Sequence, residues 1–223
     1  MKMLRVLVAC EYSGRVREAF RKLGHDAWSC DLLPSEDDSH RHIQGDVISF
    51  LTGMSEPWDM MIAHPPCTDL AVSGARHFAE KIADGRQERA LEFVRKLMAA
   101  PIPMIAIENP ISVISSRIRK PDQIIQPWMF GHPEFKATCL WLKGLPKLTP
   151  TNQLTPPKRG GYRNLTTAEV EAREREWAAW NKVHRMPPGP DRWRERSRTY
   201  HGIADAIASQ WAAYAMQKKR IAA

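Results

Sequence analysis

Two residues of the sequence combine a reactive side chain with a backbone that holds it in place: Cys67 and Glu108. Cys67 follows Pro65-Pro66, a proline pair that fixes two successive φ angles and leaves a stiff, extended backbone after an apolar run. A thiol held in one position suits a nucleophile, because a reactive atom gains most when its placement is already fixed. The alternative is a structural cysteine after a proline turn. Glu108 ends a second apolar run, where a carboxyl group can act as an acid.

The apolar runs that lead to these residues predict the strands of a buried sheet. The predicted strands are residues 4–9, 27–31, 58–63, 104–107 and 136–142. The first continues into a turn that contains Gly14, and then into a helix that Gly24 ends. Such a strand, turn and helix open a nucleotide-binding α/β sheet, in which ligands lie beyond the carboxyl ends of the strands. The expected fold is therefore a mostly parallel α/β sheet with helices on both faces.

Two acids lie where such a sheet would bind a nucleotide-like cofactor. Asp31 ends the second predicted strand, and an acid at this position can accept hydrogen bonds from ribose hydroxyls. A helix or turn cap is the alternative role for Asp31. Asp46 follows Gly45, at a position where it could meet an adenine amino group. The fingerprint of three spaced glycines is missing, because the first turn holds only Gly14.

Two polar stretches are interpreted as irregular. Residues 32–44 are predicted to form a surface loop, and residues 73–84 a mobile segment without regular structure. His40 and His42 on the first of these could suggest a metal, but are interpreted as solvated side chains. The four cysteines lie far apart, with no pair separated by two residues, so neither a zinc site nor a disulfide framework is indicated. No metal is expected.

The charge of the chain favours an anionic partner. The 223 residues carry a formal net charge of +8, for which nucleic acid is the simplest explanation and a generic basic protein the alternative. Residues 184–198 interleave arginines with Trp193 and prolines, as in the lining of a nucleic-acid groove, although a plain basic loop would look the same. The arginines expected to contact phosphates are Arg192, Arg194, Arg196 and Arg198.

The sequence predicts a cytoplasmic protein. No apolar run approaches the roughly 20 residues of a membrane span. The first residues are too quickly polar for a signal peptide. No membrane association is expected, and the oligomeric state is not indicated.

The order of these pieces resembles the C5-cytosine DNA methyltransferases, from residue 4 to about residue 215. Pro65-Pro66-Cys67 matches the nucleophile motif of that family, and Glu108-Asn109 matches its Glu-Asn motif. Ser73-Gly74 resembles the pattern downstream of the nucleophile, and residues 202–208 resemble the last motif, which returns to the cofactor site. The residues that the resemblance assigns to binding of S-adenosylmethionine are Tyr12, Ser13, Gly14, Asp31, Asp46, Pro65 and Asp205.

The resemblance implies a Rossmann-like S-adenosylmethionine-dependent methyltransferase fold, and methyl transfer to C5 of cytosine in DNA. Cytosine C5 is a weak nucleophile until the Cys67 thiolate adds to C6, while Glu108 gives a proton to N3. Glu108 would then need a raised pKa, which burial can provide. Lys136 lies where the family has an arginine, and is expected to stabilise charge on the cytosine O2. The target base must leave the stack to reach such a site.

Several positions depart from the family pattern. His64 replaces a glycine before the proline pair, and Thr68 replaces a glutamine after the cysteine. Of the family's two paired arginines, one is Lys136 here and the other is lost at Thr138. The recognition region is shortened to residues 146–196, as in short phage-type relatives. Two alternatives therefore stay open: a catalytically degenerate DNA-binding relative, and the same chemistry on a free nucleotide or RNA.

The expected organisation has three parts. Residues 1–145 form a catalytic and cofactor-binding core, and residues 146–198 a short basic insertion that resembles a recognition region. Residues 199–223 form a C-terminal helix that returns to the core. By its resemblance the chain is expected in a bacterial cell, with a phage or prophage origin.

Overall fold

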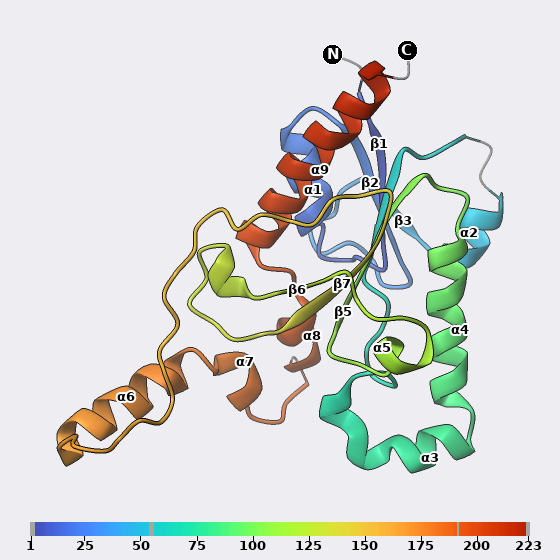
Figure 1. Cartoon of the computed structure of the whole chain (residues 1–223). Helices are drawn as coiled ribbons and strands as arrows, with labels where there is room; N and C mark the ends of the chain where they lie inside the picture. Colours follow the sequence, from blue (N-terminus) through green and yellow to red (C-terminus); the bar gives the residue numbers. More distant parts are fainter. Residues whose placement is uncertain (1–2, 54–55, 191, 222–223) are drawn as a thin grey trace.

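The computed structural model describes residues 3–53, 56–190 and 192–221, and these residues form one mixed sheet of seven strands (Figure 1). The strands are β1 (Arg5–Ala9), β2 (Asp26–Asp31), β3 (His42–Gln44), β4 (Met60–Ala63), β5 (Met104–Pro110), β6 (Gln123–Ile125) and β7 (Thr138–Lys143). Their order in the sheet is β3-β2-β1-β4-β5-β7-β6. The strands β1 to β5 run parallel, and β7 is antiparallel to both of its neighbours. The carboxyl ends of five strands therefore meet at one edge.

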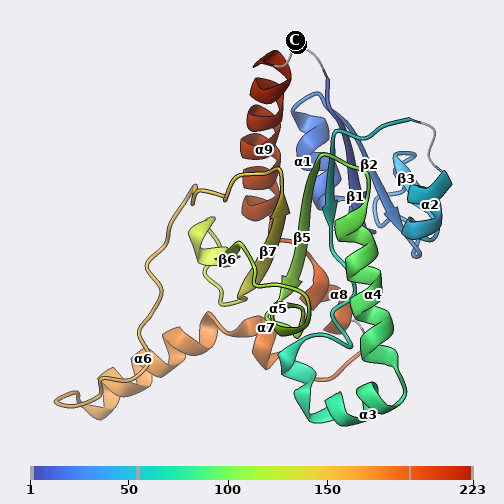
Figure 2. The same ribbon diagram turned by 45° about the vertical axis from the view of Figure 1, so that its right-hand side comes forward.

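Helices cover both faces of this sheet. They are α1 (Arg15–Lys22), α2 (Val47–Gly53), α3 (Phe78–Ala83), α4 (Arg86–Ala99), α5 (Ile114–Arg117), α6 (Thr167–Ala179), α7 (Lys182–Arg185), α8 (Arg192–Ser197) and α9 (His201–Ile221). In Figures 1 and 2, α1 and α9 lie on one side of the strands, and α2 and α4 lie on the other. This arrangement confirms the α/β fold that the sequence predicts, a mostly parallel sheet with helices on both faces.

The central strand β1 contributes side chains to two hydrophobic cores, one on each face of the sheet. Val6 and Val8 pack with α1 and α9, in a cluster that includes Trp211. Leu7 and Ala9 point to the opposite face and pack with α2 and α4. Successive side chains of a strand point to opposite faces, so a strand buried on both faces must be apolar at every position. This requirement explains the continuous apolar run by which the strand is recognised.

The C-terminal helix α9 is fixed at its first turn and in its middle. A Cβ atom on Gly202 would lie 2.0 Å from the carbonyl oxygen of Phe130, so only glycine fits at this contact. Further along, the indole nitrogen of Trp211 donates a hydrogen bond of 2.9 Å to the carbonyl of Pro146. The helix is therefore held against the same face as α1.

The prediction of a loop over residues 32–44 is wrong at its end. The short strand β3 pairs with β2, and His42 lies half-buried within it. His42 Nδ1 lies 2.8 Å from the Ser29 hydroxyl, and Nε2 lies 2.9 Å from the Leu33 carbonyl. The imidazole is therefore a structural link between two strands, rather than a solvated side chain.

A further prediction of irregular structure is also wrong. Residues 73–84 are largely helical, with a 3-10 helix η1 (Val72–His77) followed by α3. Within residues 184–198, for which a plain basic loop was the alternative to the lining of a nucleic-acid groove, the helix α8 begins at residue 192. Residue 191 lies outside the described residues.

The helix α6 extends away from the sheet together with the segment that precedes it (Figure 2). A capping box begins this helix. The Thr166 hydroxyl accepts a hydrogen bond from the backbone N–H of Glu169. In return, the Glu169 carboxylate accepts one from the backbone N–H of Thr166. Among the described residues, no helix has the length and apolar character needed to cross a membrane.

Candidate active site

The loop after β4 holds Cys67 in a turn that several hydrogen bonds fix. The carbonyl of Cys67 accepts hydrogen bonds from the N–H groups of Leu70 (3.0 Å) and Ala71 (2.9 Å). Before the turn, Asn109 Nδ2 donates a hydrogen bond of 2.8 Å to the carbonyl of Pro65. Pro65 is buried and Cys67 is exposed. The thiol thus stands at the carboxyl end of β4 on a restrained backbone.

Lys81 braces the same turn from outside. Its ammonium group donates a hydrogen bond to the carbonyl of Thr68 and lies 3.2 Å from Asp69 Oδ1. The Lys81 side chain is only 8% exposed, which is unusual for lysine and requires such partners. Sequence reasoning missed this residue because it lies in the stretch interpreted as mobile.

His64 and Glu108 form a pair at the adjacent ends of β4 and β5. His64 Nδ1 lies 3.0 Å from Glu108 Oε2, and the side chains are 12% and 17% exposed. Burial disfavours the imidazolium, but the hydrogen bond and charge of Glu108 outweigh burial and raise the pKa of His64. For Glu108, burial favours the neutral acid, but His64 and Lys136 outweigh it and lower the pKa. The expectation of a raised pKa for Glu108 is therefore wrong in this state, because His64 supplies a cation.

Lys136 completes the group around the thiol. Burial lowers the pKa of its ammonium, which shares its surroundings with Glu108 and Cys67. Lys136 Nζ donates a hydrogen bond of 3.2 Å to the carbonyl of Arg198. The surrounding protein removes water from Cys67 and raises the pKa of the thiol; Glu108 raises it further, and Lys136 opposes both. The structure thus brings together the three residues expected to be catalytic.

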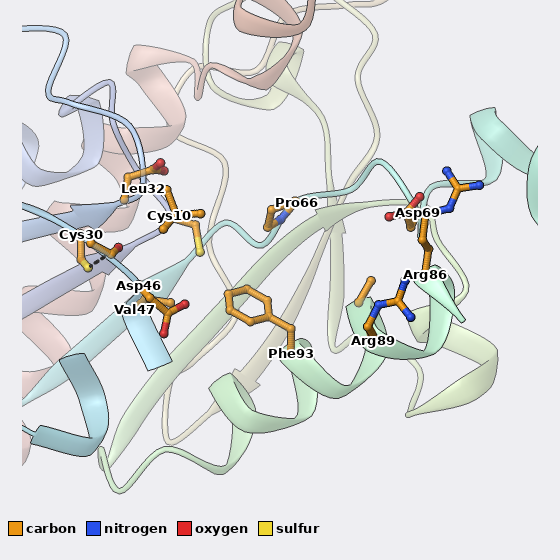
Figure 3. A pocket seen from close by; sticks show the side chains of 13 residues that line it. Cys10, Cys30, Leu32, Asp46, Val47, Pro66, Asp69, Arg86, Arg89 and Phe93 are labelled. Carbon is orange, nitrogen blue, oxygen red and sulfur yellow. Dashed lines mark hydrogen bonds between the residues drawn. The ribbon is translucent and has the colours of Figure 1, made fainter. Parts of the chain in front are cut away.

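A pocket of about 350 Å³ lies beside this group, at the ends of β1 and β2 (Figure 3). Its lining residues are Cys10, Cys30, Asp31, Leu32, Gly45, Asp46, Val47, Pro66, Asp69, Arg86, Arg89, Ala90 and Phe93. The lining combines three acids and two arginines with apolar side chains such as Val47 and Phe93. Such a surface can hold a purine ring between apolar groups, with carboxylates near its amino group and the ribose hydroxyls.

Two of these acids, Asp31 and Asp46, also have structural roles. Asp31 Oδ1 accepts a hydrogen bond of 2.9 Å from the Leu33 N–H, and burial raises the pKa of Asp31. Asp46 Oδ1 accepts hydrogen bonds of 2.8 Å from the N–H and the hydroxyl of Ser49 at the start of α2. Asp31 therefore has the turn-capping role that was its alternative. Asp46 has the corresponding role at the start of a helix. Each carboxylate has a second oxygen with which it can meet a ligand.

The turn after β1 lies outside the pocket lining. Tyr12 is buried against Trp193, with 5.8 Å between ring centroids, and its hydroxyl lies 3.4 Å from that of Ser197. Gly14 has φ 69°, and a Cβ atom there would lie 2.3 Å from the Arg17 guanidinium. Local packing therefore explains the glycine. Of the residues assigned to the cofactor, Tyr12, Ser13 and Gly14 are not among those that line the pocket.

Two other expected cofactor residues also lie apart from the pocket lining. Pro66 lines it in place of Pro65. Asp205 is exposed on α9, where its charge acts on His132. Sequence reasoning also missed Phe93, for which the only signal was an apolar residue three positions after Ala90 on the helical face.

The four arginines expected to contact phosphates divide into two pairs. Arg198 Nη2 lies 2.5 Å from Glu36 Oε1, and Arg194 lies 3.8 Å from the same oxygen. Arg192 and Arg196 form no ion pair with any described residue. The charge of Arg196 lowers the pKa of Cys67, so this arginine lies near the thiol. Within the described residues, no cluster of His, Cys, Asp and Glu is arranged to hold a metal.

Comparisons with known proteins give a weak likeness. No family model matches the chain. No curated protein matches it either. Among solved structures, a prophage-encoded protein of E. coli assigned as a DNA modification methyltransferase is similar over 74% of this chain, with 15% identity and a TM-score of 0.46. The Entamoeba histolytica methyltransferase EhMeth is similar over 69% of this chain, with 17% identity and a TM-score of 0.49.

This chain spans only 56% and 58% of the length of those two chains. At these values neither likeness identifies a family. The case for function rests on the geometry of the site.

Proposed function

We propose that this chain is an S-adenosylmethionine-dependent methyltransferase that acts on C5 of cytosine in DNA. The observation that carries the proposal is the grouping of Cys67, Glu108 and Lys136 at one edge of the sheet, beside a pocket with acids at the ends of its strands. A thiol, a carboxyl group and a cation on three different segments are the parts that covalent activation of cytosine requires.

Each of the three side chains has one task. The Cys67 thiolate adds to C6 of the base and forms a carbon–sulfur bond, which makes C5 electron-rich. Glu108 gives a proton to N3 as the thiolate adds, so that the ring stays neutral. Lys136 lies beside both groups and supplies positive charge for the cytosine O2. Loss of the C5 proton and then of the thiolate restores the ring after methyl transfer.

The resting site holds the right number of protons for this reaction. At neutral pH Cys67 is a thiol and Glu108 a carboxylate, according to the directions of their pKa shifts. The reacting site needs a thiolate and a carboxylic acid. The two states differ by the movement of one proton from sulfur to oxygen, with no net gain or loss.

The residues of the pocket fit the cofactor that the proposal requires. Asp31 would meet the ribose, Asp46 the adenine amino group, and Val47 and Phe93 the faces of the purine. The pocket opens beside Pro66, the neighbour of the nucleophile, so a ligand in it would reach toward the thiol. When bound, S-adenosylmethionine supplies an electrophilic methyl group.

DNA is the proposed partner, held through the basic segment. Of the four arginines expected to contact phosphates, Arg192 and Arg196 carry no ion pair among the described side chains, so they are placed to contact phosphates. We also propose the three-part organisation described above, with residues 146–198 as the recognition region.

A second candidate function is that of a catalytically degenerate relative of the methyltransferases, which binds DNA without methylating it. One observation favours it: the raised pKa of Cys67 and the lowered pKa of Glu108 are each opposite to what the reaction needs. The two candidates differ in whether a substrate shifts these protons.

One experiment separates the candidates and the substrates. The protein is incubated with labelled S-adenosylmethionine and, separately, duplex DNA, single-stranded DNA, RNA and dCMP, followed by nucleoside analysis. We expect label in 5-methylcytosine from DNA, and none with Cys67→Ser. Label confined to RNA or dCMP would change the substrate. Binding of S-adenosylmethionine without methyl transfer to any substrate would favour the second candidate, the DNA-binding relative without methylating activity.

A further inference from the structure

The imidazole of His64 occupies a central position among the charged groups at the strand ends. Its Nδ1 atom lies 3.0 Å from Glu108 Oε2, across the parallel pair β4 and β5. The side chain is 12% exposed and its backbone N–H donates a hydrogen bond of 2.9 Å to the carbonyl of Ala9. The ring is thus fixed at both its backbone and its Nδ1 atom.

Charged groups face His64 from every element around it. Glu108 lies on β5, Glu11 lies in the turn before α1, and Lys136 lies in the segment before β7. Asp31, at the end of β2, also senses the charge of His64. Three carboxylates and one ammonium group therefore surround one imidazole. The acids favour a protonated ring, and Lys136 opposes it.

The other ring nitrogen has no partner. His64 Nε2 is buried and forms no hydrogen bond with any described residue. A proton on Nε2 is therefore a buried donor without an acceptor, which is costly. A proton on Nδ1 has the Glu108 carboxyl as acceptor. When the ring loses a proton, it therefore loses the one on Nε2 and keeps the one on Nδ1.

We propose that His64 is a positioning residue of the active site, which fixes Glu108 through the Nδ1–Oε2 hydrogen bond and holds the proton that Glu108 delivers to the substrate base. The proposal rests on the proposed function, and adds to it a residue at a position where the related family has glycine. Glycine has no side chain with which to hold either the carboxyl group or a proton.

The proton count of the pair is the same before and after the transfer within it. In one state His64 is an imidazolium and Glu108 a carboxylate. In the other, His64 is neutral with Nδ1–H still donating to Oε2, and Glu108 carries a proton on Oε1. The change removes one proton from Nε2 and places one on Oε1, so the pair itself neither gains nor loses a proton. When Glu108 gives that proton to N3 of cytosine, the pair has lost one proton and the base has gained it. The proton that leaves the Cys67 thiol as the sulfur attacks C6 then returns the pair to its first state, so the site as a whole gains and loses none.

A conservative variant separates the two roles of the ring. In His64→Asn, the side-chain amide can still donate a hydrogen bond from near the Nδ1 position, but it cannot hold a titrating proton. Glu108→Gln removes the charge that faces the ring. His40→Asn is the matched control, because His40 is exposed and takes no part in the site. Circular dichroism first establishes that each variant is folded.

The first measurement is the titration of the His64 ring by nuclear magnetic resonance, which needs no activity. We expect the ring to titrate above its ordinary range in the parent, and at least about one pH unit lower in Glu108→Gln. An unchanged titration in that variant would overturn the proposal, because the ring and the carboxyl group would then be independent.

The second measurement is the pH profile of kcat for methyl transfer to DNA. In the parent, kcat should fall as pH rises through the pKa of the pair. In His64→Asn the carboxyl group alone holds the proton, so the fall should begin about one pH unit lower, with kcat reduced about tenfold on that limb and KM nearly unchanged. His40→Asn should match the parent. A parental profile in His64→Asn would overturn the proposal. Absence of transfer by the parent would instead overturn the proposed function and with it this role, while the ring titration would still decide whether the pair shares a proton.

Discussion

Asn109 ties the end of β5 to the loop that holds Cys67, because its side-chain amide donates a hydrogen bond of 2.8 Å to the carbonyl of Pro65. Asn109 is 1% exposed, and Pro65 follows β4, the neighbour of β5 in the sheet. A proline-rich loop has few N–H groups with which to hold itself in place. The amide therefore provides a restraint that the loop's own backbone lacks.

We expect Asn109→Ala to loosen this loop. The Pro65 carbonyl would lose its partner inside the protein, so the free energy of unfolding should fall by about 1–3 kcal/mol. Urea unfolding measures this loss, with Gln153→Ala as a control that removes an exposed amide. Methyl transfer should fall by more than stability alone explains, because Cys67 would be less well placed. A stability equal to that of the parent would contradict the assigned role of the hydrogen bond.

Lys81 provides a second restraint on the same loop. Lys81→Met keeps the length of the side chain but removes its bonds to Thr68 and Asp69. We expect kcat to fall while the affinity for S-adenosylmethionine changes little, because Lys81 does not line the pocket. Single-turnover kinetics and calorimetry measure the two effects. Lys96→Met, on an exposed position of α4, is the matched control and should behave as the parent.

These two restraints illustrate what the sequence could and could not predict. The strands and the residues at their ends were predictable, because an apolar run and the residue that follows it are local in sequence. The contacts of Lys81 with Thr68 and Asp69 require α3 to pack against the loop that holds Cys67, and no local sequence pattern indicates this packing. The bond between Arg198 and Glu36 joins residues 162 positions apart. Its partners could be found only once the chain was folded.

The pocket at the ends of β1 and β2 shows the same division. Asp31 was predicted from its place at the end of a strand, and it lines the pocket. Tyr12 was assigned by resemblance alone, and it is covered instead by Trp193, which lies far away in the sequence. β3 was missed because it has three residues, too few for an alternating pattern to be distinguished from a loop.

Asp31→Ala should weaken binding of S-adenosylmethionine by about 1–3 kcal/mol, the cost of a lost hydrogen bond to a charged group. Calorimetry measures the affinity directly. Asp205→Ala is the comparison variant, because Asp205 does not line the pocket and its loss should leave the affinity unchanged. An affinity that falls in Asp205→Ala but not in Asp31→Ala would place the cofactor elsewhere.

The pair His64 and Glu108 should make stability depend on pH in a defined direction. The pKa of His64 is raised from 6.5, so its stabilisation is complete below 6.5 and is lost as pH rises through the raised value. The pKa of Glu108 is lowered from 4.5, so its stabilisation is complete above 4.5 and is lost as pH falls through the lowered value. Between these limits both contributions are present.

We therefore expect the parent to lose free energy of unfolding between about pH 5.5 and about pH 8.5, and His64→Asn to lose less over that interval. Urea unfolding at the two pH values gives the difference. Glu11, the other acid that faces His64 most directly, is present in both proteins. Equal losses in the two proteins would mean that the pair does not stabilise the fold.

Glu36 should limit the affinity for nucleic acid. It binds Arg198 and lies near Arg194, so these arginines are partly neutralised before any phosphate arrives. We expect Glu36→Gln to bind DNA more tightly. The decrease of its affinity with rising salt concentration should be steeper, by an amount that corresponds to up to about two more phosphate contacts. Arg196→Gln should act in the opposite direction and weaken binding. Fluorescence anisotropy over a range of salt concentrations measures both slopes, and parallel slopes in all proteins would separate the basic segment from DNA binding.

Cys67 carries the most direct test of the mechanism. Cys67→Ser keeps the shape of the site but replaces the thiol by a hydroxyl, a far weaker nucleophile at neutral pH. We expect transfer to be abolished while binding of DNA and S-adenosylmethionine stays close to that of the parent. The parent should also form a covalent adduct with DNA that contains 5-fluorocytosine, because fluorine cannot leave from C5 as a proton does.

The adduct is detected as a protein–DNA band that resists denaturation, and Cys139→Ser serves as the control. Cys139 is buried on β7, so its loss should leave the adduct intact once folding is verified. An adduct that forms in Cys67→Ser would place the nucleophile on another residue. If the parent transfers methyl groups to DNA but forms no adduct with 5-fluorocytosine, covalent attack at C6 is contradicted. The fluorine at C5 should prevent release of the sulfur–carbon bond that this attack forms.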